Sequence, residues 1–194
     1  MFLVSIVWVW IKKMSSYSTL FDLYVRRLSD KQRRSLSATQ FYEFRSRYAG
    51  AGRGQSELVL CKLSTGEMTG CAGIEVSGIP NKSLKSPIAT TAPLMSNLAV
   101  GRQFRRKGIA EKLVSEVERM VQYEWGYNDC YLYVEERNKA AVKLYQKLGY
   151  KKLWVDKDAQ TLLPTNGRLQ NSSTNIVCMK KRLNLGVLGR IWPF

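Results

Sequence analysis

The chain has 194 residues, of which 45% are apolar and 24% charged, and this is enough for one globular domain with a core of its own. Its 31 Lys and Arg residues outnumber its 15 Asp and Glu residues, so the formal charge is 31 − 15 = +16. This charge indicates either an anionic partner or a solvated basic surface. Because there is no histidine, the sequence excludes Ser-His-Asp and Cys-His catalysis, histidine-ligated zinc and a histidine general base.

The N-terminal 56 residues differ in composition from the rest. Residues 1–14 form an apolar segment that is too short to span a bilayer as a helix, so we expect no stable membrane insertion. A signal-peptide core, a membrane tether and a run preceding a true start at Met14 remain open readings. Residues 15–56 form a basic region that fits either part of a transit peptide or a helical N-terminus of the domain, with a helix expected within Asp22–Tyr48.

The next part of the chain predicts strands and then a helix. Two strand-like runs, Glu57–Leu63 and Met68–Ser77, are joined by turn residues and predict a hairpin. Three prolines favour a loop over Gly78–Pro93, and a strand follows over Leu94–Val100. An amphipathic helix is expected after Phe104, because apolar residues recur at helical spacing: Ile109, Leu113, Val117, Met120 and Val121.

The remaining elements alternate between strand and helix. A strand is expected over Cys130–Val134, and a helix follows over Lys139–Leu148 with Asn138 as its N-cap. Strands then follow over Tyr150–Val155 and Ile176–Lys180, with a long polar loop over Asp156–Thr174 between them. The order predicts an α/β (α+β) domain with a mixed sheet flanked by helices.

The four cysteines predict buried free thiols. Cys61, Cys71, Cys130 and Cys178 lie in apolar, strand-like surroundings, and none forms a C-x-x-C pair. We therefore expect no metal site and no disulfide framework, and a reducing compartment suits this usage. For Cys130, a nucleophile in a covalent mechanism is an alternative to packing.

A basic segment between a strand and the amphipathic helix is the strongest local signal. It reads Arg105-Arg106-Lys107-Gly108-Ile109-Ala110. Glycine allows close approach of the backbone, and the first turn of a helix offers unpaired N–H groups to a phosphate. The alternative to a phosphate-binding loop is a basic helix start in which the glycine has no functional role.

This segment and a second one resemble the GNAT N-acetyltransferases. Residues 97–100 followed by 104–110 look like the family's acetyl-CoA-binding motif. Residues 138–150, Asn-Lys-Ala-Ala-Val-Lys-Leu-Tyr-Gln-Lys-Leu-Gly-Tyr, resemble the family's second motif, with Tyr150 in place of the usual Phe. The resemblance extends over about Glu57–Arg182, so an N-acetyltransferase domain is expected over residues 57–183 and a tail over 184–194.

The resemblance implies a GNAT-like fold whose central strands splay apart, with acetyl-CoA as co-substrate in the opening. By carry-over, the backbone of Leu98, Ala99 and Val100 meets the acetyl and pantetheine part. The pyrophosphate is held by the loop and helix start, namely Arg105, Arg106, Lys107, Gly108, Ile109 and Ala110. Asn138 contacts the cofactor from the other side, and Tyr145 matches the tyrosine that protonates the departing sulfur.

The general base is left open by the sequence. The family position that carries Glu or His in many protein acetyltransferases is Tyr133 here, and a neutral phenol is a poor base. Glu75 could act through water, and Glu135 is the other candidate. The alternative for Glu135 is a solvated carboxylate at the end of a strand with no catalytic role. For Tyr145, a core tyrosine on the apolar helix face is the alternative to the acid.

The predicted function is acetyl transfer to a protein amine, either an N-terminal α-amine or a lysine ε-amine, in a ternary complex. A small-molecule amine acetyltransferase and a non-catalytic acyl-CoA-binding sensor are the alternatives. No nucleic-acid partner is expected, because no groove-entering helix or stacking aromatics accompany the basic residues. The C-terminal part looks similar to plastid-type plant and algal members, which favours a plastid location over the cytoplasm.

Overall fold

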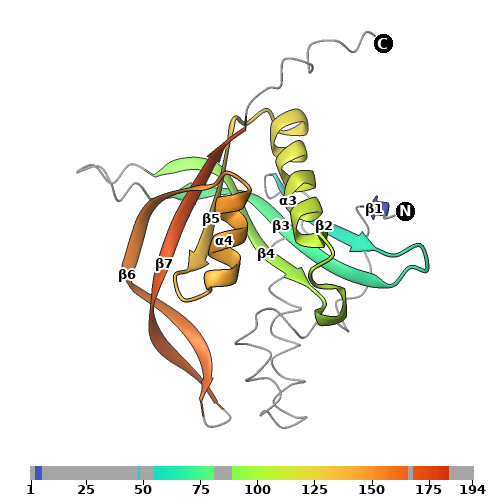
Figure 1. The fold of residues 1–194 in the computed structure, drawn as a ribbon. Coiled ribbons are helices and arrows are strands. Elements are labelled where there is room, and N and C mark those ends of the chain that lie inside the picture. The colour runs from blue at the N-terminus through green and yellow to red at the C-terminus, as the bar shows by residue number, and fades with distance from the viewer. Residues whose placement is uncertain (1–2, 6–47, 49–54, 81–88, 166–167, 184–194) are drawn as a thin grey trace.

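A computed structural model describes residues 3–5, 48, 55–80, 89–165 and 168–183. Its strands form one seven-stranded sheet in the order β1-β2-β3-β4-β5-β7-β6 (Figure 1). The main elements are β1 (Leu3–Ser5), β2 (Ser56–Lys62), β3 (Met68–Ile79), β4 (Thr90–Val100), α3 (Ile109–Arg119), β5 (Asp129–Glu135), α4 (Lys139–Lys147), β6 (Lys151–Thr165) and β7 (Arg168–Arg182). From β2 onward, the predicted order of strands and helices is confirmed.

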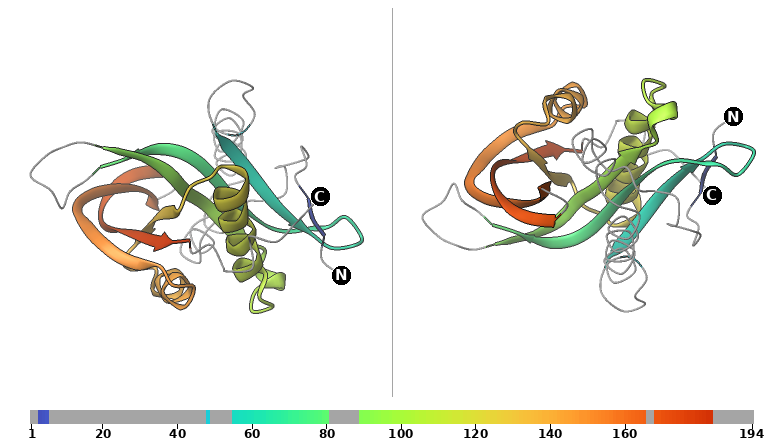
Figure 2. Two further views of the ribbon diagram at one scale, coloured as in Figure 1. Left: turned by 90° about the horizontal axis from the view of Figure 1, so that it is seen from above. Right: turned by 90° about the horizontal axis from the view of Figure 1, so that it is seen from below.

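Helices α3 and α4 cover the same face of the sheet, and the two further views in Figure 2 show both helices beside it. Ile109, Leu113 and Val117 are almost fully buried in one cluster with Leu132 of β5 and Tyr145 of α4. The apolar spacing of α3 therefore predicted its buried face correctly. A π-helical turn, Met120–Glu124, continues α3.

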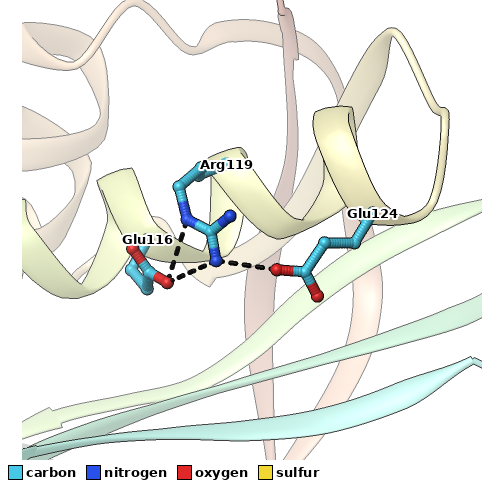
Figure 3. Close-up of polar contacts among 3 residues, drawn as sticks. All are labelled: Glu116, Arg119 and Glu124. Carbon is cyan, nitrogen blue, oxygen red and sulfur yellow. Dashed lines mark hydrogen bonds and ion pairs between the residues drawn. The ribbon is translucent and has the colours of Figure 1, made fainter. Parts of the chain in front are cut away.

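An ion-pair network crosses the junction between α3 and this turn. Arg119 bonds Glu116 of α3 at 2.8 Å and Glu124 of the turn at 2.7 Å, so one guanidinium ties the two together (Figure 3).

The centre of the sheet splays, as the GNAT resemblance implied. Parallel strands β4 and β5 pair at Leu94↔Tyr131 and Met95↔Leu132. In contrast, β5 pairs with β7 along its whole length, from Asp129↔Arg182 to Glu135↔Ile176. The C-terminal half of β4 therefore extends beyond its pairing with β5, and its backbone groups on that side need other partners.

The polar loop expected over Asp156–Thr174 is wrong. Strands β6 and β7 pair across this region as far as Thr165↔Arg168 and form one long hairpin (Figure 1). Asn166-Gly167 lies between these paired residues in the sequence, and Asn-Gly is the pair most typical of two-residue hairpin connections. That signal outweighs the polar composition from which the loop was predicted.

The loop expected over Gly78–Pro93 is also wrong at both ends, because β3 reaches Ile79 and β4 begins at Thr90. Pro93 is tolerated inside β4 for a geometric reason. Its register partner Val76 donates its N–H to Gln55 rather than to β4, so the missing N–H of Pro93 interrupts no bond to β3. Residues 81–88 lie outside the described residues.

The N-terminal region adds one strand that the sequence did not predict. Leu3–Ser5 pairs with β2 at Val4↔Cys61, so part of the apolar N-terminal run is strand. The helix expected within Asp22–Tyr48 lies outside the described residues, apart from the helical Tyr48. Within the described ranges, no helix is long and apolar enough to cross a membrane. The tail over 184–194 also lies outside them.

Candidate active site

The basic loop connects the splayed end of β4 to the start of α3. Phe104 is buried and anchors the loop, while the Arg105 Nε donates to the carbonyl of Val100 at 3.1 Å. Arg105 thereby fixes the loop to the strand. Arg106 and Lys107 are exposed, and Arg106 adopts a left-handed φ of 63°.

Gly108 is the N-cap of α3, with a left-handed φ of 74° and no side-chain cap. A Cβ at this position would meet nothing within 4 Å, so the space directly beside Gly108 is open. Glycine adopts this φ without steric cost, and the N–H groups of the first helical turn face this end of the helix. The helix start therefore presents N–H groups beside two exposed cationic side chains, an arrangement that suits an anion.

Asn138 performs the capping role that the sequence predicts. Its Oδ1 accepts a hydrogen bond from the N–H of Ala141 at 3.2 Å, which satisfies one donor of the first turn of α4. The side-chain oxygen is thus engaged within its own helix.

Tyr145 is buried on the inner face of α4. Its ring meets the ring of Tyr150 edge-on at 5.8 Å, and it joins the core cluster with Cys130. Burial, followed by the neighbouring Cys130 sulfur, raises the pKa of the Tyr145 phenol above its ordinary value. The phenol is therefore protonated at neutral pH and can donate a proton.

The other carried-over residues lie along the half of β4 that pairs with β3 but not with β5. Leu98 and Val100 are half-buried and Ala99 is buried, all beyond the last residue that pairs with β5. A bulge interrupts this half of the strand: Cys71 pairs with Ala99, but Gly73 pairs with Ser96, so two residues of β4 face one of β3.

With this geometry established, comparison with known proteins identifies the family. A family model described as "Acetyltransferase (GNAT) family" matches residues 18–150, which is more than half of the chain.

The chain belongs to the GNAT acetyltransferase family.

Two curated relatives illustrate this relationship. A curated GCN5-related N-acetyltransferase 7, chloroplastic, from Arabidopsis thaliana is 39% identical over 56 residues, which are 29% of this chain and 20% of the relative. An N-alpha-acetyltransferase from Saccharolobus solfataricus is 36% identical over 59 residues, 30% of this chain and 35% of the relative. The matches thus span about a fifth to a third of these relatives' lengths.

A solved GNAT structure shares the fold. The acetyltransferase from Elizabethkingia anophelis, with acetyl-CoA bound, has a TM-score of 0.57 over 94% of this chain and 97% of that one, at 16% identity.

The four cysteines pack in the interior of the domain. All four are buried and free, as predicted. Burial raises the pKa of both Cys71 and Cys130 to about 12, so neither is a thiolate at neutral pH. This favours packing over a covalent mechanism at Cys130. In the described part of the chain, no three or more His, Cys, Asp or Glu side chains lie close enough together to bind a metal ion.

The candidate bases differ in their surroundings. The Glu135 carboxylate accepts a hydrogen bond from the Arg137 Nε at 2.6 Å, so it is engaged in an ion pair at the end of β5. Burial raises the pKa of Tyr133 to about 12, so this phenol is not a base. Glu75 pairs with Leu94 in the β3–β4 register and is half-buried on the sheet face opposite α3 and α4, which Gly73 shares.

Two of the basic residues near the C-terminus are paired within the protein. Lys180 contacts Asp129 at 2.8 Å, and Lys181 contacts Glu118 at 2.7 Å. The first pair joins β7 to β5 and the second joins β7 to α3, and both reduce the cationic surface that remains to dock a partner.

One further group is the hydroxyl of Tyr48, which the sequence placed on an amphipathic helix but not at the site. It lies against the β4 bulge, within hydrogen-bond distance of Ser96 and Asn97. Its contact with the sheet depends on Gly73, since a Cβ at that position would collide with the phenol of Tyr48. A lone glycine in a strand does not reveal which residue approaches it.

Proposed function

We propose that the chain is an acetyl-CoA-dependent N-acetyltransferase that moves an acetyl group to a protein amine, either an N-terminal α-amine or a lysine ε-amine. One observation carries the proposal. The glycine-capped start of α3 follows the half of β4 that does not pair with β5, and a protonated phenol, Tyr145, lies on α4 over the same sheet face.

The proposed chemistry divides among three parts of the chain. Acetyl-CoA supplies an activated thioester carbonyl. The loop and helix start, from Arg105 to Ala110, bind its pyrophosphate. Backbone groups near Leu98 polarise the carbonyl, and Tyr145 returns a proton to the departing sulfur. Transfer is direct in a ternary complex, because the buried Cys130 thiol is a poor nucleophile.

Glu75 is the proposed base, acting through water on the incoming ammonium group. It is half-buried on the sheet face opposite the helices, on the strand that pairs with β4. Asn138 is proposed to contact the cofactor through groups other than its capping oxygen.

A protein acceptor is supported by the similarity to an N-alpha-acetyltransferase. A spermidine N-acetyltransferase from Vibrio cholerae shares the fold at 14% identity, so a small cationic amine is the second acceptor class that the experiment includes. The similarity to a chloroplastic relative supports a plastid location, which a fluorescent fusion of the full chain would test.

The deciding experiment incubates the protein with labelled acetyl-CoA and a peptide library that varies N-termini and lysines, with polyamines in parallel. We expect label on peptides and tight acetyl-CoA binding by calorimetry. Gly108→Glu adds a side chain and a negative charge at the phosphate position. It should weaken acetyl-CoA binding by roughly a hundredfold while leaving the fold intact. Label on polyamines alone would reassign the acceptor, and binding without any transfer would favour an acyl-CoA sensor.

A further inference from the structure

The bulge in β4 carries an unusual backbone conformation. Asn97 has a left-handed φ of 54° inside a strand. This conformation is unfavourable for a residue with a Cβ, and Asn is among the few residue types that tolerate it. The bulge also lies beyond Met95, the last residue of β4 that pairs with β5. Pairing with β5 therefore does not hold this conformation.

Tyr48 supplies contacts that hold it. The Nδ2 of Asn97 donates to the Tyr48 Oη at 2.9 Å, and the same Oη lies 2.8 Å from the Oγ of Ser96. The Nδ2 of Asn97 also reaches the Ser96 Oγ at 3.3 Å. One phenol thus contacts both side chains at the start of the bulge.

The sheet makes room for this contact at one position. Gly73 of β3 is the register partner of Ser96, and a Cβ there would overlap the Tyr48 ring. The absence of a side chain at Gly73 lets a residue far away in the sequence reach β4. The contact is therefore built from three segments: Tyr48, β3 and β4.

We propose that Tyr48 is a positioning residue: its hydroxyl holds Asn97 in the left-handed conformation and so orients the backbone of Leu98 toward the thioester carbonyl. This inference rests on the carbonyl position given in the proposed function. Preorganised backbone donors contribute to catalysis only when they are held near the reacting oxygen. A small displacement of such a donor is costly, about a hundredfold for 1 Å.

The test variant is Tyr48→Phe, which keeps the ring against Gly73 and removes only the hydroxyl. The matched control is Tyr123→Phe, because the Tyr123 side chain is 56% exposed on the π-helical turn. Calorimetry measures binding of acetyl-CoA and of CoA separately. In Tyr48→Phe we expect unchanged CoA affinity and a preference for acetyl-CoA over CoA reduced by roughly fivefold, the scale of one hydrogen bond.

Turnover gives a second readout. With an acceptor peptide from the library, Tyr48→Phe should lower kcat by about tenfold and leave the KM for acetyl-CoA nearly unchanged. Hydrogen exchange over residues 96–100 should accelerate, since the bulge has lost its anchor. Ser96→Ala keeps the Tyr48–Asn97 bond and should have a smaller effect of the same kind, so it provides a second test should Tyr48→Phe fail to fold.

The outcomes separate this inference from the proposed function. If the unmodified protein binds neither acetyl-CoA nor CoA, the proposed function fails. If it binds and transfers, but Tyr48→Phe matches Tyr123→Phe in acetyl preference and kcat, the positioning role of Tyr48 is overturned. A loss of CoA affinity equal to the loss of acetyl-CoA affinity would also overturn it, because that pattern indicates general structural damage.

Discussion

The two faces of the splayed sheet are built in different ways. On the face covered by α3 and α4, the candidate groups come from two short stretches of sequence, residues 105–110 and 138–150. On the opposite face, the contact at the bulge joins Tyr48, Gly73 and Ser96, which come from three separate segments. Local motifs thus encode the face that we assign to the cofactor, whereas tertiary structure assembles the other face.

Replacing Tyr145 tests the helix-covered face and has the largest expected effect. Tyr145→Phe keeps the ring packed against Tyr150 and removes the proton donor. Loss of a general acid costs about 10²-fold or more, so kcat should fall by at least that factor while the affinity for acetyl-CoA stays unchanged. Steady-state kinetics and calorimetry measure the two quantities. Turnover equal to that of the unmodified protein would assign Tyr145 to packing alone.

The buried thiols predict a loss of stability at alkaline pH. Burial raises the pKa of Cys71 and of Cys130 to about 12 in the folded protein, whereas an exposed thiol in the unfolded chain has the ordinary value near 9.0. Below pH 9 both states hold the proton and stability does not depend on these groups. As the pH rises from 9 toward 12, only the unfolded chain releases protons, so each thiol lowers the free energy of unfolding by about 1.4 kcal/mol per pH unit.

Urea unfolding at pH 8 and pH 10.5 measures this effect. Cys130→Ala should lower the free energy of unfolding at pH 8, because it leaves a small cavity. Above pH 9, however, its free energy of unfolding should fall less steeply with pH, because one titrating thiol has been removed. The same decline in Cys130→Ala as in the unmodified chain would show that the thiol takes no part. Since Cys130 packs beneath α4 and Cys71 on the other face, the matching Cys71→Ala variant compares the two faces directly.

How well the sequence predicted each region follows from the range of the interactions. The burial of Ile109, Leu113 and Val117 was predictable, because helical periodicity is a local property. The Asn138 cap was predictable for the same reason, since its partner Ala141 is three residues away.

The regions that were not predicted depend on distant partners. Strands β6 and β7 stabilise each other across a hairpin, and polar residues in that stretch suggested a loop when each strand was considered alone. Likewise, no local pattern links Tyr48 to Asn97, which lies 49 residues away. The position of the bulge, and the residue that contacts it, emerge only when the sheet is assembled.

The ion-pair network at the end of α3 should have the smallest effect of all. Arg119 bonds Glu116 and Glu124, but its side chain is 46% exposed, and water and salt screen such pairs (Figure 3). Arg119→Ala should therefore lower the free energy of unfolding by about 0.5 kcal/mol at low salt and by less at high salt. Because the network lies at the opposite end of α3 from Gly108, kcat and acetyl-CoA affinity should not change. Urea unfolding at two salt concentrations, combined with Glu124→Gln in a double-mutant cycle, measures the coupling. A loss of activity in Arg119→Ala would mean that the C-terminal end of α3 influences the phosphate-binding end. The site on the helix-covered face would then depend on residues outside the two short motifs, which would contradict the comparison between the two faces.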